Sequence, residues 1–244
     1  MTAADHAGLF TQRAWDRIAD WREAVETMPF IRALADGSLP TDAFAHYLTQ
    51  DAAYLIEFAR ALSMVSQLAP SRTAQAFFAQ SAHTALDVES ALHRDWLRAH
   101  GATATATASG GGSGEASPVT VAYTDHLLAT CARGSYPVAV AAVLPCYWLY
   151  AHIGDTLLRQ AGDLSGHRYE RWIATYADPG FQDATATARR LADEAAESAD
   201  PSTLGAMFAA FERSSTYEYL FFDQGIRRPT WPTPATIGVT STGP

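Results

Sequence analysis

Apolar residues recur at three- and four-residue spacing through most of this 244-residue chain. This spacing is typical of amphipathic helices, because successive turns of an α-helix bring such positions onto one face. The strand pattern, in which β-branched and aromatic residues alternate with polar ones, does not persist anywhere for long. The pattern therefore predicts an all-α fold.

Prolines, glycines and candidate caps divide this pattern into separate helices. The first helix is limited by Pro29, and the turn LADGSLP leads to a second helix for which Thr41 is the expected cap. The predicted helices span about residues 9–28, 42–68, 72–100, 119–132, 136–161, 166–175, 181–198 and 202–225.

One internal segment differs in composition from the helices around it. Residues 102–117, ATATATASGGGSGEAS, lack large apolar side chains and have a Gly/Ser core, which is typical of a flexible surface loop. Neither flanking half looks self-sufficient. We therefore expect a single helical domain over residues 1–230 with this inserted loop, and a loose tail over residues 231–244.

The composition is that of a globular protein, with 48% apolar and 18% charged residues. Every basic residue is arginine, and the net charge is −9. This balance argues against a nucleic-acid partner, which requires a clustered basic face, and against attraction to an anionic membrane. The most apolar run, residues 138–150, is too short for a membrane span and predicts a core helix.

Two cysteines cannot form a disulfide framework in a chain of this length. The N-terminal residues MTAADHAGLF have neither a charged nor an apolar signal region. We therefore expect a cytoplasmic protein.

Two carboxylates interrupt predicted apolar stripes. Asp51 lies within the stripe of the second helix, with Tyr54 flanking the same face, and Glu218 lies within the stripe of the last helix. A buried glutamate tends to a raised pKa, which suits a proton donor near neutral pH. The structural alternatives are a hydrogen bond that Asp51 accepts from a neighbouring helix and an ion pair of Glu218 with Arg213 or Arg228.

A thiol lies in the most apolar helix. Cys146 follows Pro145, which removes one helical hydrogen bond, so that a kink can open space beside the sulfur. A cysteine in an apolar run is more often inert packing, and this alternative is stronger for Cys131. A thiol, two carboxylates and several tyrosines on the inner faces of different helices could instead line one pocket that binds and attacks a flat, nitrogen-rich ring.

The histidines offer a competing metal site. His83, Asp87, Glu89 and His93 include i,i+4 spacings, which can place metal ligands on one helix face. The Glu-x-x-His pair of a carboxylate-bridged di-iron site is missing, so we expect a solvated, salt-bridged helix and no metal. The sequence also lacks a glycine-rich phosphate loop, a Gly-x-Ser-x-Gly elbow and a Cys-x-x-Cys pair.

Four segments together resemble the TenA family, also called thiaminase II or aminopyrimidine aminohydrolase, which has a haem-oxygenase-like helical fold. They are YLTQDAAYLIEFARAL, AYTDHLLATCARGSYPVAVAAVLPCYWLYAHIG, YERWIATYADPGF and STYEYLFFDQGIRRPTWP. They occur in the family order across nearly the whole chain, and LPCYWLY is the most specific of the markers.

The resemblance implies hydrolysis of thiamin-derived aminopyrimidines, chiefly 4-amino-5-aminomethyl-2-methylpyrimidine to its hydroxymethyl form, and cleavage of thiamin, in thiamin salvage. It implies that Cys146 is the nucleophile, that Asp51 holds the exocyclic amine and ring nitrogen, and that Glu218 handles the ring-nitrogen proton. It also implies that pocket-lining tyrosines bind the substrate, and it requires no cofactor. These tyrosines are Tyr54, Tyr123, Tyr150 and Tyr176.

The chain also departs from the family pattern. Ala52 and Ala53 replace bulkier residues after the Gln-Asp pair, which would enlarge or reshape the pocket and alter substrate preference. Phe222 replaces a common tryptophan, and Gly225 and Ile226 replace an alanine-tyrosine pair, so the closing helix is expected to pack differently. The loop at residues 102–117 is longer than is usual in the family.

Two other functions stay open from the sequence. One is a non-catalytic aminopyrimidine-binding or regulatory protein, and the other is a metal-dependent oxygenase on the same helical scaffold that uses His83 and Glu89. The expected partner is a small pyrimidine. The resemblance further implies a homo-oligomer, usually a tetramer.

Overall fold

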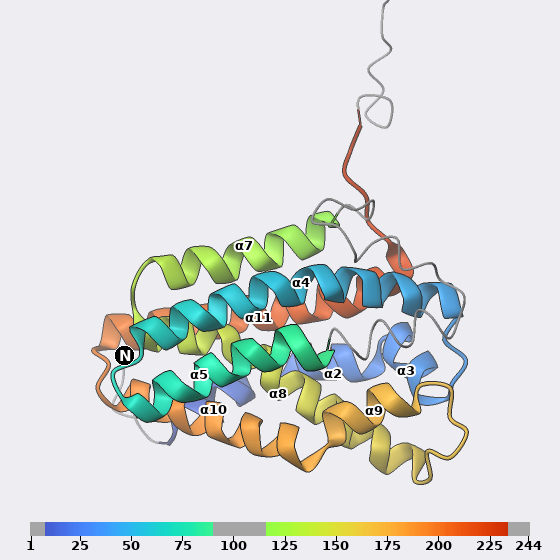
Figure 1. Cartoon of the computed structure of the whole chain (residues 1–244), viewed down its shortest axis with the longest axis horizontal. Helices are drawn as coiled ribbons and strands as arrows, with labels where there is room; N and C mark the ends of the chain where they lie inside the picture. The colour runs from blue at the N-terminus through green and yellow to red at the C-terminus, as the bar shows by residue number, and fades with distance from the viewer. Residues whose placement is uncertain (1–7, 90–115, 234–244) are drawn as a thin grey trace, which may run out of the picture.

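The computed structural model describes residues 8–89 and 116–233, and within these ranges it contains helices and no strand. The helices form an elongated bundle in which the longest ones run along the long axis (Figure 1). The predicted all-α fold is confirmed.

Three long helices form the centre of the bundle. They are α4 (Thr41–Leu68), α8 (Tyr136–Ala161) and α11 (Pro201–Arg227), and each contacts the other two. By length and composition α8 could cross a membrane, but 78% of its apolar window is buried inside the protein. The helix therefore serves as the core helix that the sequence predicts, covered on its sides by other helices.

Shorter helices cover this centre on several sides. Helix α5 (Arg72–Thr84) packs against α4 and continues into a π-helical turn, η2 (Ala85–Glu89), while α7 (Pro118–Ala132) lies along another side of α4 (Figure 1). Helices α9 (Glu170–Ala177) and α10 (Pro179–Glu197) pack against α8. The space enclosed by α4, α5, α8, α9 and α10 holds the cavity described below.

The N-terminal region differs from the prediction of one helix over residues 9–28. It forms α1 (Phe10–Arg17) and α2 (Ala19–Thr27), which are separated at the fully buried Ile18. A third helix, α3 (Pro29–Ala35), starts where the sequence pattern predicts an end. Proline ends the helix before it but also suits the first position of a new one, because that position needs no backbone N–H.

Other helix boundaries agree with the prediction in some places and differ from it in others. The predicted helix at 136–161 matches α8, whereas Thr41 is not a cap, because Pro40 occupies that position and Thr41 is the first helical residue. Helix α9 begins at Glu170 rather than at Gly166, whose φ of +76° is incompatible with a right-handed helix. Residues 90–115, including most of the predicted loop, and residues 234–244 of the predicted tail lie outside the described residues.

The closing helix, α11, has a close contact that depends on glycine. Gly225 of α11 lies directly against the ring of Phe30 on α3, and a Cβ atom at position 225 would overlap with Phe30. Phe222 is fully buried one turn earlier, with its ring centroid 5.0 Å from that of Tyr150. The absence of a side chain at position 225 therefore lets α11 pack closely against α3.

Candidate active site

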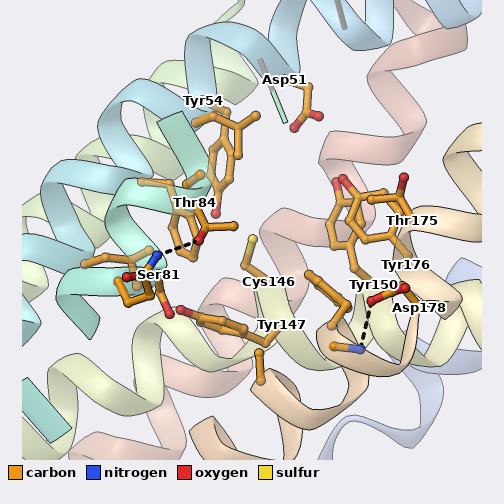
Figure 2. A pocket seen from close by; sticks show the side chains of 18 of the residues that line it. Asp51, Tyr54, Ser81, Thr84, Cys146, Tyr147, Tyr150, Thr175, Tyr176 and Asp178 are labelled. Atoms are coloured by element: carbon orange, nitrogen blue, oxygen red, sulfur yellow. Dashed lines mark hydrogen bonds between the residues drawn. The ribbon is translucent and has the colours of Figure 1, made fainter. Parts of the chain in front are cut away.

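A cavity of about 620 Å³ lies between α4, α5, α8, α9 and α10. Five of the residues predicted to form the site line this cavity, and they come from three of these helices (Figure 2): Asp51, Tyr54, Cys146, Tyr150 and Tyr176. The structure therefore brings together a thiol, a carboxylate and three phenols from segments far apart in the sequence.

The two cysteines have different surroundings. Cys146 is partly exposed and lines the cavity on α8, and the hydroxyl of Tyr54 points toward its sulfur (Figure 2). Cys131 is buried away from the cavity, and burial raises the pKa of its thiol to about 12. Cys131 is therefore an inert packing residue, whereas Cys146 can meet a ligand. Helix α8 continues without interruption through Pro145, so the cavity does not depend on a break in the helix.

Asp51 supplies a carboxylate at one end of the cavity. It is only 2% exposed, and its side chain extends from α4 into the region that Tyr150 and Tyr176 face from the other side (Figure 2). A carboxylate at the surface of a mainly apolar cavity attracts a cation or a pair of N–H donors more strongly than one in water. Asp51 therefore suits recognition of a nitrogen-rich ring.

Glu218 and Tyr123 lie behind the cavity wall rather than on its surface. The Tyr123 hydroxyl donates a 2.6 Å hydrogen bond to Oε1 of Glu218, and neither residue is among those that line the cavity. Burial raises the pKa of Glu218 to about 8, the charge of Asp51 raises it as well, and the hydrogen bond from Tyr123 opposes both effects. Glu218 is thus a protonated carboxylic acid at neutral pH.

The structural alternative for Glu218, an ion pair with Arg213 or Arg228, is wrong. Arg228 is exposed and donates to Asp42 at 2.7 Å, at the far end of α11. Arg213 is exposed, whereas Glu218 is only 1% exposed. The hydrogen bond that the structure shows for Glu218 comes from the neutral phenol of Tyr123. This bond lowers the pKa of Glu218 less than burial raises it, so the carboxyl stays protonated at neutral pH.

Two close contacts place the tyrosines of the cavity wall. The hydroxyls of Tyr47 and Tyr150 are 2.9 Å apart, which orients the ring of Tyr150. A Cβ atom on Gly154 of α8 would lie 2.6 Å from the carbonyl carbon of Tyr176, so only glycine lets α9 approach this closely. The ring centroids of Tyr150 and Tyr176 are consequently 4.7 Å apart.

The sequence interpretation missed the wall formed by α5 and the start of α10. Its residues are Phe77, Gln80, Ser81, Thr84, Asp178, Gly180, Phe181 and Ala184. The four from α5 fall on one helix face, so periodicity could have indicated a shared surface but not its partner. In contrast, Ala52 and Ala53 do not line the cavity. The expectation that they reshape it is wrong, because the helical rotation that directs Asp51 inward turns the next two positions away.

The competing metal site finds no support among the described residues. Within residues 8–87 and 116–233 no group of three or more potential ligands gathers. His83 and Asp87 lie 3.5 Å apart on an exposed face. His93 and the side chain of Glu89 lie outside the described part of the chain.

Comparison with known proteins places this arrangement in a family. The model of the TENA/THI-4/PQQC family matches residues 15–228. The chain is 38% identical over 221 residues to the thiamine biosynthesis multifunctional protein ThiED of Corynebacterium glutamicum, which covers 91% of this chain and 27% of that protein. It is 30% identical over 223 residues to the aminopyrimidine aminohydrolase of Bacillus subtilis, which covers 91% of this chain and 92% of that one. The chain thus spans about a quarter of the length of the corynebacterial relative.

Solved structures agree on the fold. A TenA homologue from P. horikoshii OT3 superposes with a TM-score of 0.77 at 24% identity, over 90% of this chain and 99% of that one. A domain from Shewanella denitrificans described as having a heme oxygenase-like fold superposes with a TM-score of 0.64 at 14% identity, over 96% of this chain and 97% of that one. The helical architecture is therefore haem-oxygenase-like. On the family match and the Bacillus subtilis relative, the chain belongs to the TENA/THI-4/PQQC family.

Proposed function

We propose that the protein hydrolyses thiamin-derived aminopyrimidines in thiamin salvage, releasing ammonia from 4-amino-5-aminomethyl-2-methylpyrimidine and cleaving thiamin at the bridge to its thiazole. The observation that carries this proposal is that the Cys146 thiol and the Asp51 carboxylate line one cavity together with several aromatic side chains. The name of the Bacillus subtilis relative, an aminopyrimidine aminohydrolase, supports the same reaction.

The cavity surface suits a flat heteroaromatic substrate. Aromatic rings of Tyr54, Tyr150 and Tyr176 border the space between Asp51 and Cys146, and they can stack on a ring or direct its edge. The charged residues that line the described cavity are Asp51 and Asp178, both acidic. In the proposed complex Asp51 accepts two hydrogen bonds from the amidine-like edge of the pyrimidine. This contact orients the ring over the sulfur.

Glu218 supplies the proton in the proposed reaction. Its pKa of about 8 keeps it protonated at neutral pH, and protonation of the ring nitrogen makes the adjacent ring carbon electrophilic. Because Glu218 lies behind the cavity wall, the substrate has to bind at the end of the cavity where Asp51 is near this carboxyl. The repulsion that Asp51 exerts on ionised Glu218 is consistent with that proximity.

Cys146 completes the chemistry as nucleophile. Its thiolate adds to the activated ring carbon, and electron flow from the adduct expels ammonia from the protonated aminomethyl group, or neutral thiazole from the thiazolium of thiamin. Water then adds to the resulting methide, and the thiolate leaves. Tyr54 is in position to donate to the sulfur, and it remains a neutral phenol, since burial raises its pKa well above the usual value.

The test is ammonia release from the aminomethylpyrimidine by the wild-type protein, the Cys146→Ala protein and a Cys131→Ala control. We expect release by the wild type and the control and a loss of at least about a thousandfold in Cys146→Ala, because covalent catalysis requires the sulfur. Binding without release by the wild type would indicate a non-catalytic binder. Activity that depends on bound iron would indicate the oxygenase.

Three further statements stay predictions from the sequence. They are a cytoplasmic location, a homotetramer, and a single domain over residues 1–230. Light scattering of the purified protein measures the oligomeric state, and limited proteolysis between residues 102 and 117 followed by gel filtration shows whether the two halves stay together.

A further inference from the structure

Four buried polar side chains meet at the N-terminal end of α7. Gln50 comes from α4, Ser117 and Thr120 from the start of α7, and Gln224 from α11. Each is at most 4% exposed. Burial of so many polar groups is costly unless each has a partner, so their mutual contacts have to be specific.

The hydrogen bonds of this cluster are complementary. Oε1 of Gln50 accepts from the backbone N–H of Ser117 at 2.9 Å and from the Thr120 hydroxyl at 2.8 Å. The Thr120 hydroxyl in turn accepts from Nε2 of Gln224 at 3.3 Å. The Ser117 hydroxyl donates to Oε1 of Gln224 at 2.5 Å and accepts from the backbone N–H of Thr120 at 3.1 Å, as an N-cap does. Each bond has one donor and one acceptor.

The same three helices carry the buried acid and its neighbours. Gln50 directly precedes Asp51 on α4, Thr120 lies one turn before Tyr123 on α7, and Gln224 lies six residues after Glu218 on α11. A shift of α7 by a single residue would move the Tyr123 hydroxyl by about 1.5 Å along the helix axis. Such a shift would break its 2.6 Å bond to Glu218.

We propose that Gln50, Thr120 and Gln224 are positioning residues, which fix α7 against α4 and α11 so that Tyr123 stays hydrogen-bonded to Glu218. The catalytic consequence rests on the proposed function, in which Glu218 donates a proton. The cluster itself does not touch the cavity. Its influence on the reaction passes through Tyr123.

The hydrogen bond from Tyr123 is one of the effects that determine the pKa of Glu218. The hydrogen bond from Tyr123 lowers the pKa of Glu218, while burial and the charge of Asp51 raise it. Other ionisable groups that interact with Glu218 come from α4 and α8: Tyr47, Tyr54 and Tyr150. Burial raises the pKa of each of these phenols, so they are neutral at the pH of interest, and Asp51 and Tyr123 dominate.

The experiment compares two threonines of the same helix. Thr120→Val removes the hydroxyl that bonds to Gln50 and Gln224, and Thr120→Ser retains it. Thr124→Val is the matched control, because Thr124 is also buried on α7 but, within the described part of the chain, its hydroxyl bonds to carbonyls of its own helix. Circular dichroism checks that each variant is folded. The pKa of Glu218 is measured by ¹³C NMR of carboxyl-labelled protein, with the resonance assigned by its loss in Glu218→Gln.

We expect Thr120→Val to raise the pKa of Glu218 in the same direction as Tyr123→Phe, with no further rise when the two are combined. Thr120→Ser and Thr124→Val should leave it near the wild-type value. In the ammonia assay Thr120→Val should lower kcat about tenfold with a smaller change in KM.

An unchanged pKa in folded Thr120→Val, while Tyr123→Phe raises it, would overturn the proposal, as would equal shifts in Thr120→Val and Thr124→Val. No pKa change in Tyr123→Phe itself would overturn it as well. Failure of the proposed function has a different signature. The wild-type protein would then release no ammonia, whatever the pKa measurements show.

Discussion

The hydroxyl of Tyr123 on α7 donates a 2.6 Å hydrogen bond to the carboxyl of Glu218 on α11. Both side chains are at most 1% exposed. A phenol donor stabilises the ionised carboxylate, whereas burial favours the neutral acid, and burial is the larger effect. The pair therefore holds a proton at neutral pH, and the groups around it determine the pKa at which this proton is lost.

The pH dependence of catalysis follows from this proton. In the proposed reaction Glu218 is the acid, and because its pKa is about 8 we expect kcat/KM for ammonia release to fall as the pH rises through that value. Tyr123→Phe removes a hydrogen bond that lowers the pKa, so the alkaline limb should move to higher pH while the maximal rate falls about tenfold. An alkaline limb that stays in place in Tyr123→Phe would argue against Glu218 as its origin.

Replacement of Asp51 should shift the pKa of Glu218 in the opposite direction. Its negative charge raises the pKa of Glu218, so Asp51→Asn should lower that pKa and move the alkaline limb down. The same change removes a charged acceptor from the cavity, and we expect the affinity for the aminopyrimidine to fall about 10- to 100-fold. Calorimetric titration of Cys146→Ala, with and without Asp51→Asn, measures this affinity without turnover. Equal affinities would rule out a direct contact with Asp51.

Stability should also depend on the protonation of Glu218. Its pKa is about 8 in the folded protein and near 4.5 in the unfolded chain, so the folded state binds the proton more tightly. The resulting stabilisation is complete below about pH 4.5 and is lost progressively as the pH rises to about 8, by an amount on the order of a few kcal/mol. Urea denaturation of wild type and Glu218→Gln at several pH values checks this, since the variant should lack that part of the slope. Parallel slopes in the two proteins would contradict the buried acid.

A substitution at Gly154 tests whether the close contact between α8 and α9 positions the cavity wall. In Gly154→Ala the added Cβ would lie 2.6 Å from the carbonyl carbon of Tyr176, so α9 has to move away from α8. We expect a loss of about 1–3 kcal/mol in the free energy of unfolding and a higher KM. Gly205→Ala is the control, because Gly205 lies in α11 with open space around it and alanine favours helix. Comparable destabilisation by the two changes would show that close approach is not the cause.

The sequence predicts much of this architecture because each long helix carries its own periodic signal. The bounds of α8 follow from its apolar run, and Asp51 and Glu218 stand out as carboxylates within apolar stripes. The break at Ile18 does not follow, since this residue fits the periodic pattern and lies buried between α1 and α2. Local periodicity contains no information about such a change of helix direction.

The features that the sequence does not reveal are contacts between distant segments. Gln50 bonds to residues 67 and 70 positions away, and Thr120 meets Gln224 at a separation of 104. Each of these polar residues, taken alone, fits an ordinary solvated helix face. Likewise, Gly154 looks like a weak point in a helix until Tyr176 is placed against it. Their roles become visible only when the helices are packed together.

The most direct test of the substrate site is a crystal structure of the Cys146→Ser protein soaked with 4-amino-5-aminomethyl-2-methylpyrimidine. We expect the ring to lie in the cavity between Tyr54 and Tyr150, with its amidine edge on Asp51 and its reactive carbon facing the side chain at position 146. A ring bound elsewhere, or bound with Asp51 and position 146 both out of contact, would contradict the assignment of this cavity as the active site.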